Sequence, residues 1–257
     1  MTTPAARSVL AVHGNGGGAF RFARLVPHVQ PALRFEAVTL PGFAQVPADP
    51  ALQTLQDYAA RLHERVLALP RPRVLLGHGI GGSIALEYGQ HYAEALDGMI
   101  LHAPVGARLD QRLFPRLMKL PGMRTAGQRV FASRLTRPLM RRLLFDEPVP
   151  ADYAHQFFEE YRHCTVFGQM FDLITAPWFN GLAPIDTPTI LLWGAEERVL
   201  KVEQAEAFLR LLPQGSLEIV PGWGHFPMVE HPKAYARYID ELAWRLIKGS
   251  SAAERSV

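Results

Sequence analysis

Hydrophobic positions along the chain follow two alternating patterns. Short runs of consecutive apolar residues are separated by longer runs in which apolar residues recur every three to four positions. The short runs are typical of strands buried on both faces, and the longer runs are typical of amphipathic helices. The alternation predicts an α/β fold with a mainly parallel sheet of about six strands flanked by helices. The candidate strands cover residues 8–14, 35–42, 73–79, 98–104, 189–195 and 216–222.

Helical periodicity is clearest over residues 54–69, 201–212 and 232–249. Thr54 is a suitable N-cap for the first of these helices, and Pro232 suits the first turn of the last one. The first seven and the last ten residues are small and polar, without apolar periodicity. We expect both ends to lie outside the fold.

Residues 105–187 form a long insert after the fourth candidate strand. The insert contains no convincing strand, and helical periodicity appears around residues 112–120, 137–145 and 153–174. We expect residues 1–104 and 188–257 to form the core and residues 105–187 to form a helical lid over its site. Large aromatic side chains in the lid indicate a pocket for an aromatic or aliphatic group, or else they form the core of the lid itself. These residues are Phe114, Phe131, Phe157, Phe158, Phe167, Phe171 and Trp178.

Composition sets limits on location and chemistry. The chain has 257 residues, of which 48% are hydrophobic, enough for the core of one globular domain. No run approaches eighteen uncharged apolar residues and no signal peptide is visible, so we expect a cytoplasmic protein without stable membrane insertion. The single cysteine, Cys164, excludes an intramolecular disulfide and a cysteine-based zinc site. Its helical context argues against a nucleophilic role.

Positive charge is concentrated in the first half of the insert. Ten Lys or Arg residues lie between Val105 and Phe145, against the single acid Asp110. The favoured interpretation is that these side chains cover the solvated faces of helices. Alternatively, they line a path for an anionic substrate, and attachment to anionic lipid is a lesser possibility. Nothing in the sequence supports nucleic-acid binding.

Four motifs follow candidate strands, and the carboxyl ends of parallel strands meet at one edge of a sheet. "VHGNGGG" covers residues 12–18, "GHGIGG" 77–82, "WGAEERV" 193–199 and "GWGHFPMVEHP" 222–232. The glycine-rich first motif lacks the spacing of a nucleotide-binding fingerprint. In this order the motifs resemble the oxyanion loop, nucleophile elbow, acid turn and histidine loop of the α/β-hydrolase fold family, from Ser8 to about Ile247.

The resemblance implies roles for particular residues. His225 would be the general base, and Glu197 would hold its tautomer and stabilise the imidazolium, with the adjacent Glu196 as a competing assignment. The backbone N–H groups of Asn15 and Ile80 would form the oxyanion hole. A buried histidine packed in the core is the alternative for His225.

Gly79 departs from the family pattern, because it occupies the nucleophile position of the elbow. Glycine relieves backbone strain of about 1 to 3 kcal/mol there, and without a side chain it cannot form a covalent acyl-enzyme. Ser83, one helical turn further on, is expected to point into helix packing and cannot replace the missing serine.

Residues expected to contact substrate are Gly14, His102 and Trp178, whereas His78 is interpreted as structural. We expect no cofactor and no metal, and a small-molecule substrate with an apolar body, which would be anionic if the basic side chains of the insert line its path. Three hypotheses follow. In the first, the chain is an enzyme that uses a His–Glu dyad as base for water-mediated hydrolysis or lyase-type proton abstraction. In the second, it is a non-catalytic binding protein. In the third, it is an esterase-like serine hydrolase inactivated by replacement of residue 79.

Overall fold

The computed structural model describes residues 7–253, except for the side chains of Phe114 and of residues 250–253. Six strands form one sheet in the order β2-β1-β3-β4-β5-β6, and every neighbouring pair is parallel. The predicted fold class is therefore confirmed. The strands are β1 (Arg7–Val12), β2 (Leu33–Val38), β3 (Arg73–His78), β4 (Gly98–His102), β5 (Thr189–Gly194) and β6 (Gly215–Val220).

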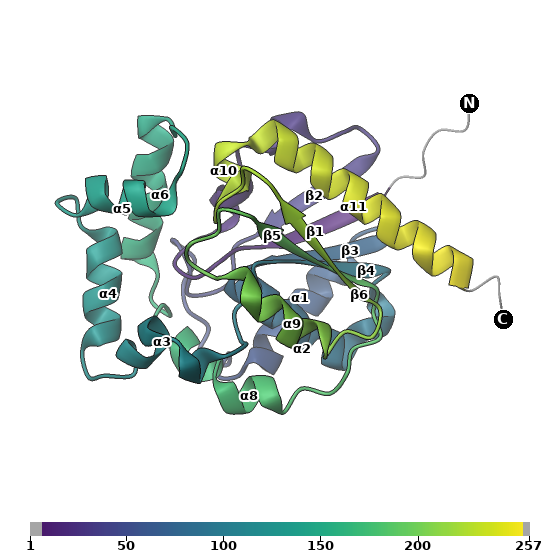
Figure 1. Cartoon of the computed structure of the whole chain (residues 1–257), viewed down its shortest axis with the longest axis horizontal. Helices are drawn as coiled ribbons and strands as arrows, with labels where there is room; N and C mark the ends of the chain where they lie inside the picture. Colours follow the sequence, from purple (N-terminus) through teal and green to yellow (C-terminus); the bar gives the residue numbers. More distant parts are fainter. Residues whose placement is uncertain (1–6, 254–257) are drawn as a thin grey trace.

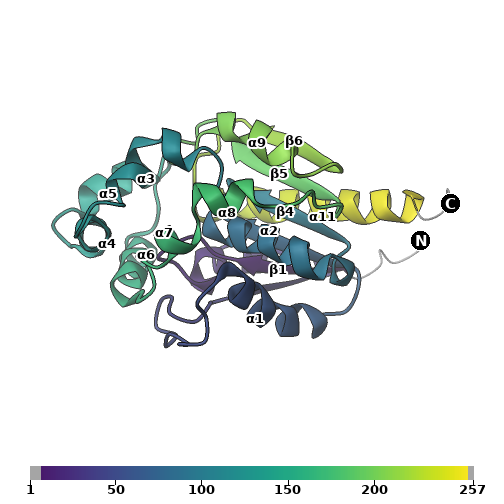
Figure 2. The same ribbon diagram turned by 90° about the horizontal axis from the view of Figure 1, so that it is seen from below.

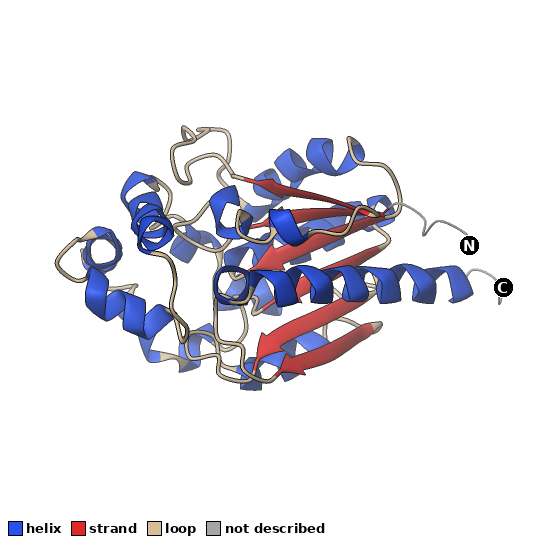
Figure 3. Cartoon of the chain, turned by 90° about the horizontal axis from the view of Figure 1, so that it is seen from above, coloured by secondary structure: helices blue, strands red, loops and turns tan. Residues whose placement is uncertain are grey.

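Helices cover both faces of the sheet (Figures 1, 2 and 3). The long α11 lies across one face, and α1 and α2 cover the other. The inner strands β1, β4 and β5 are buried along their whole length, whereas the edge strands β2 and β6 are half-exposed. The core helices are α1 (Leu55–Leu67), α2 (Ile80–Tyr92), α9 (Ala205–Leu209), α10 (Pro227–Glu230) and α11 (Pro232–Ala253).

Local sequence signals set several helix boundaries. Thr54 caps α1 as predicted, and its capping box is completed by Asp57, whose N–H donates to Thr54 and whose carboxylate accepts from the Thr54 N–H. Pro232 is the first residue of α11. The expected helix over 201–212 is shorter than predicted, since residues Val202–Gln204 form a 3-10 turn before α9.

The predicted limits of the ordered chain were wrong at two places. Arg7 belongs to β1, because its N–H donates to the Ala32 carbonyl and its guanidinium pairs with Asp240. Helix α11 continues to Ala253, past the polar boundary set at residue 248. Residues 1–6 and 254–257 of the expected tails lie outside the described residues.

The insert between β4 and β5, residues 103–188, has no strand among its described residues. It lies beyond the carboxyl ends of the strands (Figure 3). The helix predicted to run from 153 to 174 ends at His163, because the N–H of Thr165 donates to the Gly42 carbonyl of the core at 2.8 Å. The helices of the insert are α3 (Leu113–Leu117), α4 (Met123–Ala132), α5 (Arg137–Leu144), α6 (Ala151–His163), α7 (Met170–Leu173) and α8 (Ala176–Asn180).

Candidate active site

His225 and Glu197 come together from two loops that follow neighbouring strands. Glu197 lies in the turn after β5 and His225 in the loop after β6, and His225 Nδ1 is 2.5 Å from Glu197 Oε2. The other carboxylate oxygen accepts the N–H groups of Val199 at 2.6 Å and Leu200 at 3.0 Å. Glu196 is exposed, and its carboxylate has no partner among the described residues. Of the two candidate acids, Glu197 is the one that contacts the histidine.

The Glu197 carboxylate is buried but remains ionised. Burial alone would raise its pKa, but the charge of His225 and hydrogen bonds from His225, Leu200 and Val199 hold the pKa below its usual value. The carboxylate therefore accepts a hydrogen bond from the Nδ1–H group of His225 and leaves Nε2 of the ring as the nitrogen free to act as a base.

Gly79 stands at the start of α2 with φ 57° and ψ −117°. Its N–H donates to the His102 carbonyl at 3.1 Å, and its carbonyl accepts the N–H groups of Gly82 and Val105. A Cβ added at this glycine would approach only Gly14 Cα, at 3.4 Å. The elbow conformation is thus kept without its side chain, and the space above the residue is open.

The loop after β1 lies opposite this turn. The backbone N–H groups of Asn15 and Ile80 donate to no acceptor among the described residues. His13 fixes the loop, because its Nδ1 donates to the Gly14 carbonyl at 2.9 Å and its Nε2 accepts the Leu40 N–H at 3.2 Å. Burial lowers the pKa of His13 to about 4, so the ring is neutral at pH 7 and can serve both contacts.

A cavity of about 180 Å³ joins these groups. Gly14, Asn15, Gly79, Ile80 and His225 line its core side. The insert supplies a largely apolar wall, as expected for a small-molecule site. Residues of this wall are Val105, Leu109, Phe131, Leu144, Tyr161, Phe167, Met170, Phe171 and Ile174.

Two of the predicted substrate contacts are wrong. His102 is fully buried and does not line the cavity, because its Nδ1 faces the Tyr235 hydroxyl at 3.2 Å on the side covered by α11. Trp178 also lies away from the cavity, since its indole N–H donates to Glu87 of α2 at 2.7 Å. Gly14 is the one predicted contact of the three that does line it.

His78 lines the cavity but is engaged in holding the histidine loop. Its Nε2 donates to the His225 carbonyl at 3.0 Å. Burial, followed by the charges of His225 and His102, lowers the pKa of His78 well below its usual value, so the ring stays neutral. Its contact therefore positions the backbone of His225.

Neither alternative nucleophile faces the cavity. Ser83 is fully buried and donates to the Val105 carbonyl at 2.7 Å. Cys164 is buried, and burial raises the pKa of its thiol to about 12. Among the described residues no group of three or more His, Cys, Asp or Glu side chains is arranged to hold a metal ion.

Three cations line the cavity, and one of them was not anticipated from the sequence. Arg21 is only 2% exposed, pairs with Glu160 through Nε at 3.0 Å and stacks over Phe157. The position of an arginine within the apolar stretch "AFRF" is the signal that could have indicated its burial. Arg112 is half-buried and donates to the neutral acceptors Val199 O at 2.6 Å and Gln204 Oε1 at 3.4 Å.

The third cation, Lys119, is exposed and has no ion-pair partner among the described residues. Burial lowers the pKa of Arg112 and the Glu197 charge opposes this, but a guanidinium keeps its proton. The cavity therefore carries uncompensated positive charge on its insert side.

Comparison with known proteins is consistent with this geometry. A model of the alpha/beta hydrolase family matches residues 9–238, so the chain belongs to that family. The pimeloyl-[acyl-carrier protein] methyl ester esterase of Edwardsiella ictaluri is 25% identical over 254 residues, which cover 92% of this chain and 93% of the esterase.

Two further proteins extend the comparison. The 2-hydroxy-6-oxo-6-(2'-aminophenyl)hexa-2,4-dienoic acid hydrolase of Metapseudomonas resinovorans is 24% identical over 239 residues, which cover 89% of this chain and 81% of that protein. An esterase from Exiguobacterium antarcticum shares the fold, with a TM-score of 0.75 and 18% identity over 93% of this chain and 92% of the esterase. The named relatives are thus esterases and hydrolases.

Proposed function

We propose that this chain is a hydrolytic or lyase-type enzyme that works without a covalent intermediate. The observation that carries the proposal is the 2.5 Å contact between His225 and Glu197 at the edge of a cavity whose floor is Gly79. Nε2 of His225 takes a proton from a water molecule or from a substrate hydroxyl. The N–H groups of Asn15 and Ile80 stabilise the oxyanion that develops on the substrate, each by about 2.7 to 4 kcal/mol.

Gly79 contributes space. Because a Cβ there would meet only Gly14 Cα at 3.4 Å, the volume that a serine side chain would fill is open to the attacking water or to the substrate. The buried ionised Glu197 supports this mechanism, since it holds Nδ1 as the protonated nitrogen and stabilises the imidazolium.

The substrate that suits the cavity is small and apolar, with one anionic group. The aromatic and aliphatic wall from the insert would hold the apolar body, and Arg112 with Lys119 would attract a carboxylate. The dienoic acid named for the Metapseudomonas hydrolase combines an aryl group with a carboxylate and is therefore one suitable probe. Residues 105–187 would act as a lid that excludes bulk water during the reaction.

A second candidate function is that of a serine hydrolase inactivated at residue 79. The observation in its favour is the retained elbow conformation of Gly79, which leaves room for a serine. The two proposals predict opposite results for Gly79→Ser. In a nucleophile-free enzyme the added hydroxymethyl group occupies the space of the water and lowers turnover, whereas in an inactivated esterase it restores ester hydrolysis.

The test compares the native chain with Gly79→Ser on para-nitrophenyl butyrate and on the aryl dienoic acid. Turnover by the native chain that falls in Gly79→Ser supports the proposal. If the native chain hydrolyses neither compound and the Gly79→Ser variant hydrolyses the ester, the result supports the inactivated serine hydrolase. Binding without turnover by either protein supports a non-catalytic binding protein and overturns the proposal.

A further inference from the structure

Exposed apolar side chains gather on one part of the insert. Among the described residues ten large hydrophobic side chains are exposed, and six of these lie between residues 113 and 143. Four of the six surround the corner between α4 and α5, and we call them the α5 patch. The α5 patch consists of Val130 (40% exposed), Leu135 (93%), Leu139 (64%) and Leu143 (48%).

Three leucines of the patch are spaced four residues apart. Leu139 and Leu143 therefore share one face of α5, and Leu135 lies in the turn that precedes this helix. We call these three residues the leucine stripe. Figures 1 and 2 show α4 and α5 at the end of the molecule that lies away from both termini. Exposed apolar side chains that gather in one region are typical of interaction surfaces.

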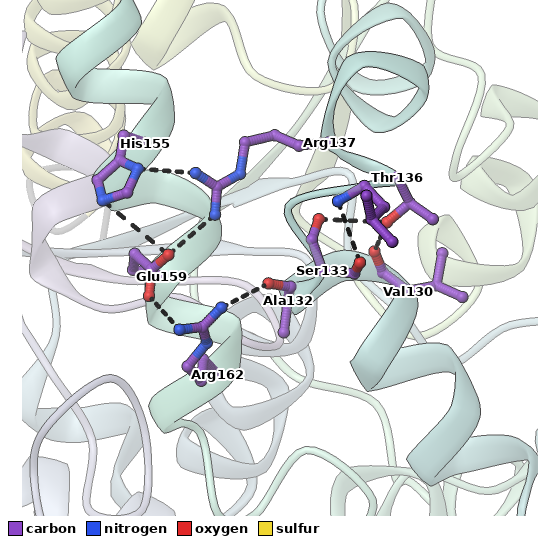
Figure 4. Close-up of polar contacts among 9 residues, drawn as sticks. Val130, Ala132, Ser133, Thr136, Arg137, His155, Glu159 and Arg162 are labelled. Atoms are coloured by element: carbon purple, nitrogen blue, oxygen red, sulfur yellow. Dashed lines mark hydrogen bonds and ion pairs between the residues drawn. The ribbon is translucent and has the colours of Figure 1, made fainter.

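The opposite face of α5 is fixed to the rest of the insert, as Figure 4 shows for its first turn. Arg137 donates to His155 Nδ1 at 2.7 Å and to Glu159 at 2.9 Å, and Arg162 pairs with the same carboxylate at 3.3 Å. The Thr136 hydroxyl donates to the Val130 carbonyl and ties the two helices together at the corner.

Further along α5, the Met140 and Leu144 side chains are buried. Arg141 donates to the Val149 carbonyl at 2.8 Å. The helix is thus held by its inner face, and its leucine stripe faces outward.

Unpaired cations flank the stripe. Arg129, Arg134 and Arg142 are exposed, and none of them has an ion-pair partner among the described residues. The acids nearest in sequence lie beyond the end of α5, where Asp146 pairs with Arg198. The face therefore combines apolar side chains with net positive charge.

We propose that the α5 patch docks this protein on the surface of an anionic lipid membrane. Leucines on one face of a helix and arginines beside them are what an interfacial helix presents to acyl chains and anionic headgroups. A second copy of the chain fits this face less well, because a two-fold contact pairs the same face with itself and would bring two positively charged surfaces together. No helix in the described part of the chain is long and apolar enough to span a membrane, and docking of this kind requires none.

Two residues adjacent to the patch in sequence line the cavity. Phe131, next to Val130 on α4, and Leu144, next to Leu143 on α5, both line the cavity wall. The two helices that would rest on the lipid thus also enclose the site, which would bring an apolar substrate dissolved in the membrane close to its entrance. The docking itself does not depend on the chemistry proposed above, and His225→Ala is expected to bind lipid as the native chain does.

The test is cosedimentation with vesicles of phosphatidylcholine alone or mixed in equal parts with phosphatidylglycerol. The native chain should bind only the mixed vesicles. The pair Arg134→Gln and Arg142→Gln should lower its partition coefficient about 30-fold, since each basic side chain near an anionic surface contributes about 1 kcal/mol. The pair Leu135→Ser and Leu139→Ser should lower it at least about tenfold.

A matched control carries the same kinds of change on α1. Arg65 and Leu67 are exposed there, Leu67 to 50%, and Arg65→Gln with Leu67→Ser should leave lipid binding unchanged. Native binding that is absent, or that the patch variants do not weaken, overturns the proposal. Concentration-dependent dimers in sedimentation velocity that the leucine variants abolish, without lipid binding, would assign the patch to a second copy of the chain instead.

Discussion

Replacing Glu197 by glutamine keeps the size of the side chain and removes its charge. One oxygen of this carboxylate accepts the Val199 and Leu200 N–H groups, at 2.6 and 3.0 Å, and the other faces His225 Nδ1 at 2.5 Å. A glutamine has only one acceptor oxygen, which the two backbone N–H groups will hold, so its NH2 group must face Nδ1. Nδ1 then has to accept a hydrogen bond, and the ring proton moves to Nε2, the nitrogen needed as base.

The size of the effect follows from the same geometry. With Nδ1 and Oε2 2.5 Å apart, the charge centres of imidazolium and carboxylate are about 4 Å apart, and at an effective dielectric of about 20 they attract by about 4 kcal/mol. That dielectric suits the pair, because the side chains of Glu197 and His225 are only 1% and 10% exposed. Losing the attraction in the transition state lowers turnover about 10³-fold.

The assay is the initial rate on whichever probe the native chain turns over faster. Glu196→Gln is the matched control, since this neighbouring carboxylate is exposed and its loss should change the rate less than about threefold. Thermal melting of both variants verifies that each is folded. A Glu197→Gln rate within about threefold of the native rate, or equal losses in the two variants, would show that the Glu197 charge does not support the base.

Three further predictions follow from the described contacts. Gly79→Ser should lower the free energy of unfolding by about 1 to 3 kcal/mol, measured in urea, because φ is 57° there; an unchanged midpoint would contradict the assigned strain. Burial lowers the pKa values of His13 and His102 to about 4 and about 3, so both side chains bind fewer protons in the folded than in the unfolded chain. The free energy of unfolding should therefore fall by about 1.4 kcal/mol per pH unit for each histidine as the pH drops from 6.5 toward 4. A urea midpoint that stays constant over that range would contradict this prediction. Arg112→Gln should raise the KM for a carboxylate-bearing substrate about tenfold or more with little change in kcat, because Arg112 lines the cavity. The control Arg116→Gln should leave the KM unchanged. Equal KM values for the two variants would show that Arg112 does not bind the substrate.

Strand positions could be predicted because each strand is a short apolar run that ends at a glycine-bearing turn. The order of the strands in the sheet is set by long-range packing, which one sequence does not display. Helix α4 was missed, since Gly127 lies within it and Gly122 directly precedes it, and the helix packs against α6, a contact that local sequence does not display.

Some site residues could be placed from the sequence and others could not. His225 and Glu197 follow strands whose carboxyl ends meet, so the topology alone predicts their proximity. His102 also ends a strand, but it pairs with Leu192 in the ladder and its ring packs beside Tyr235 beneath α11. The direction of that side chain, like that of Trp178 toward Glu87, is decided by helices distant in sequence.

In the proposed mechanism His225 carries the chemistry without a protein nucleophile. The most direct test is the ratio of turnover numbers of the native chain and His225→Ala on the probe that the native chain turns over. Loss of the base should reduce turnover by about 10²- to 10⁴-fold, to the rate supported by the oxyanion hole and binding alone. An unchanged turnover number in His225→Ala would show that this histidine is not the base.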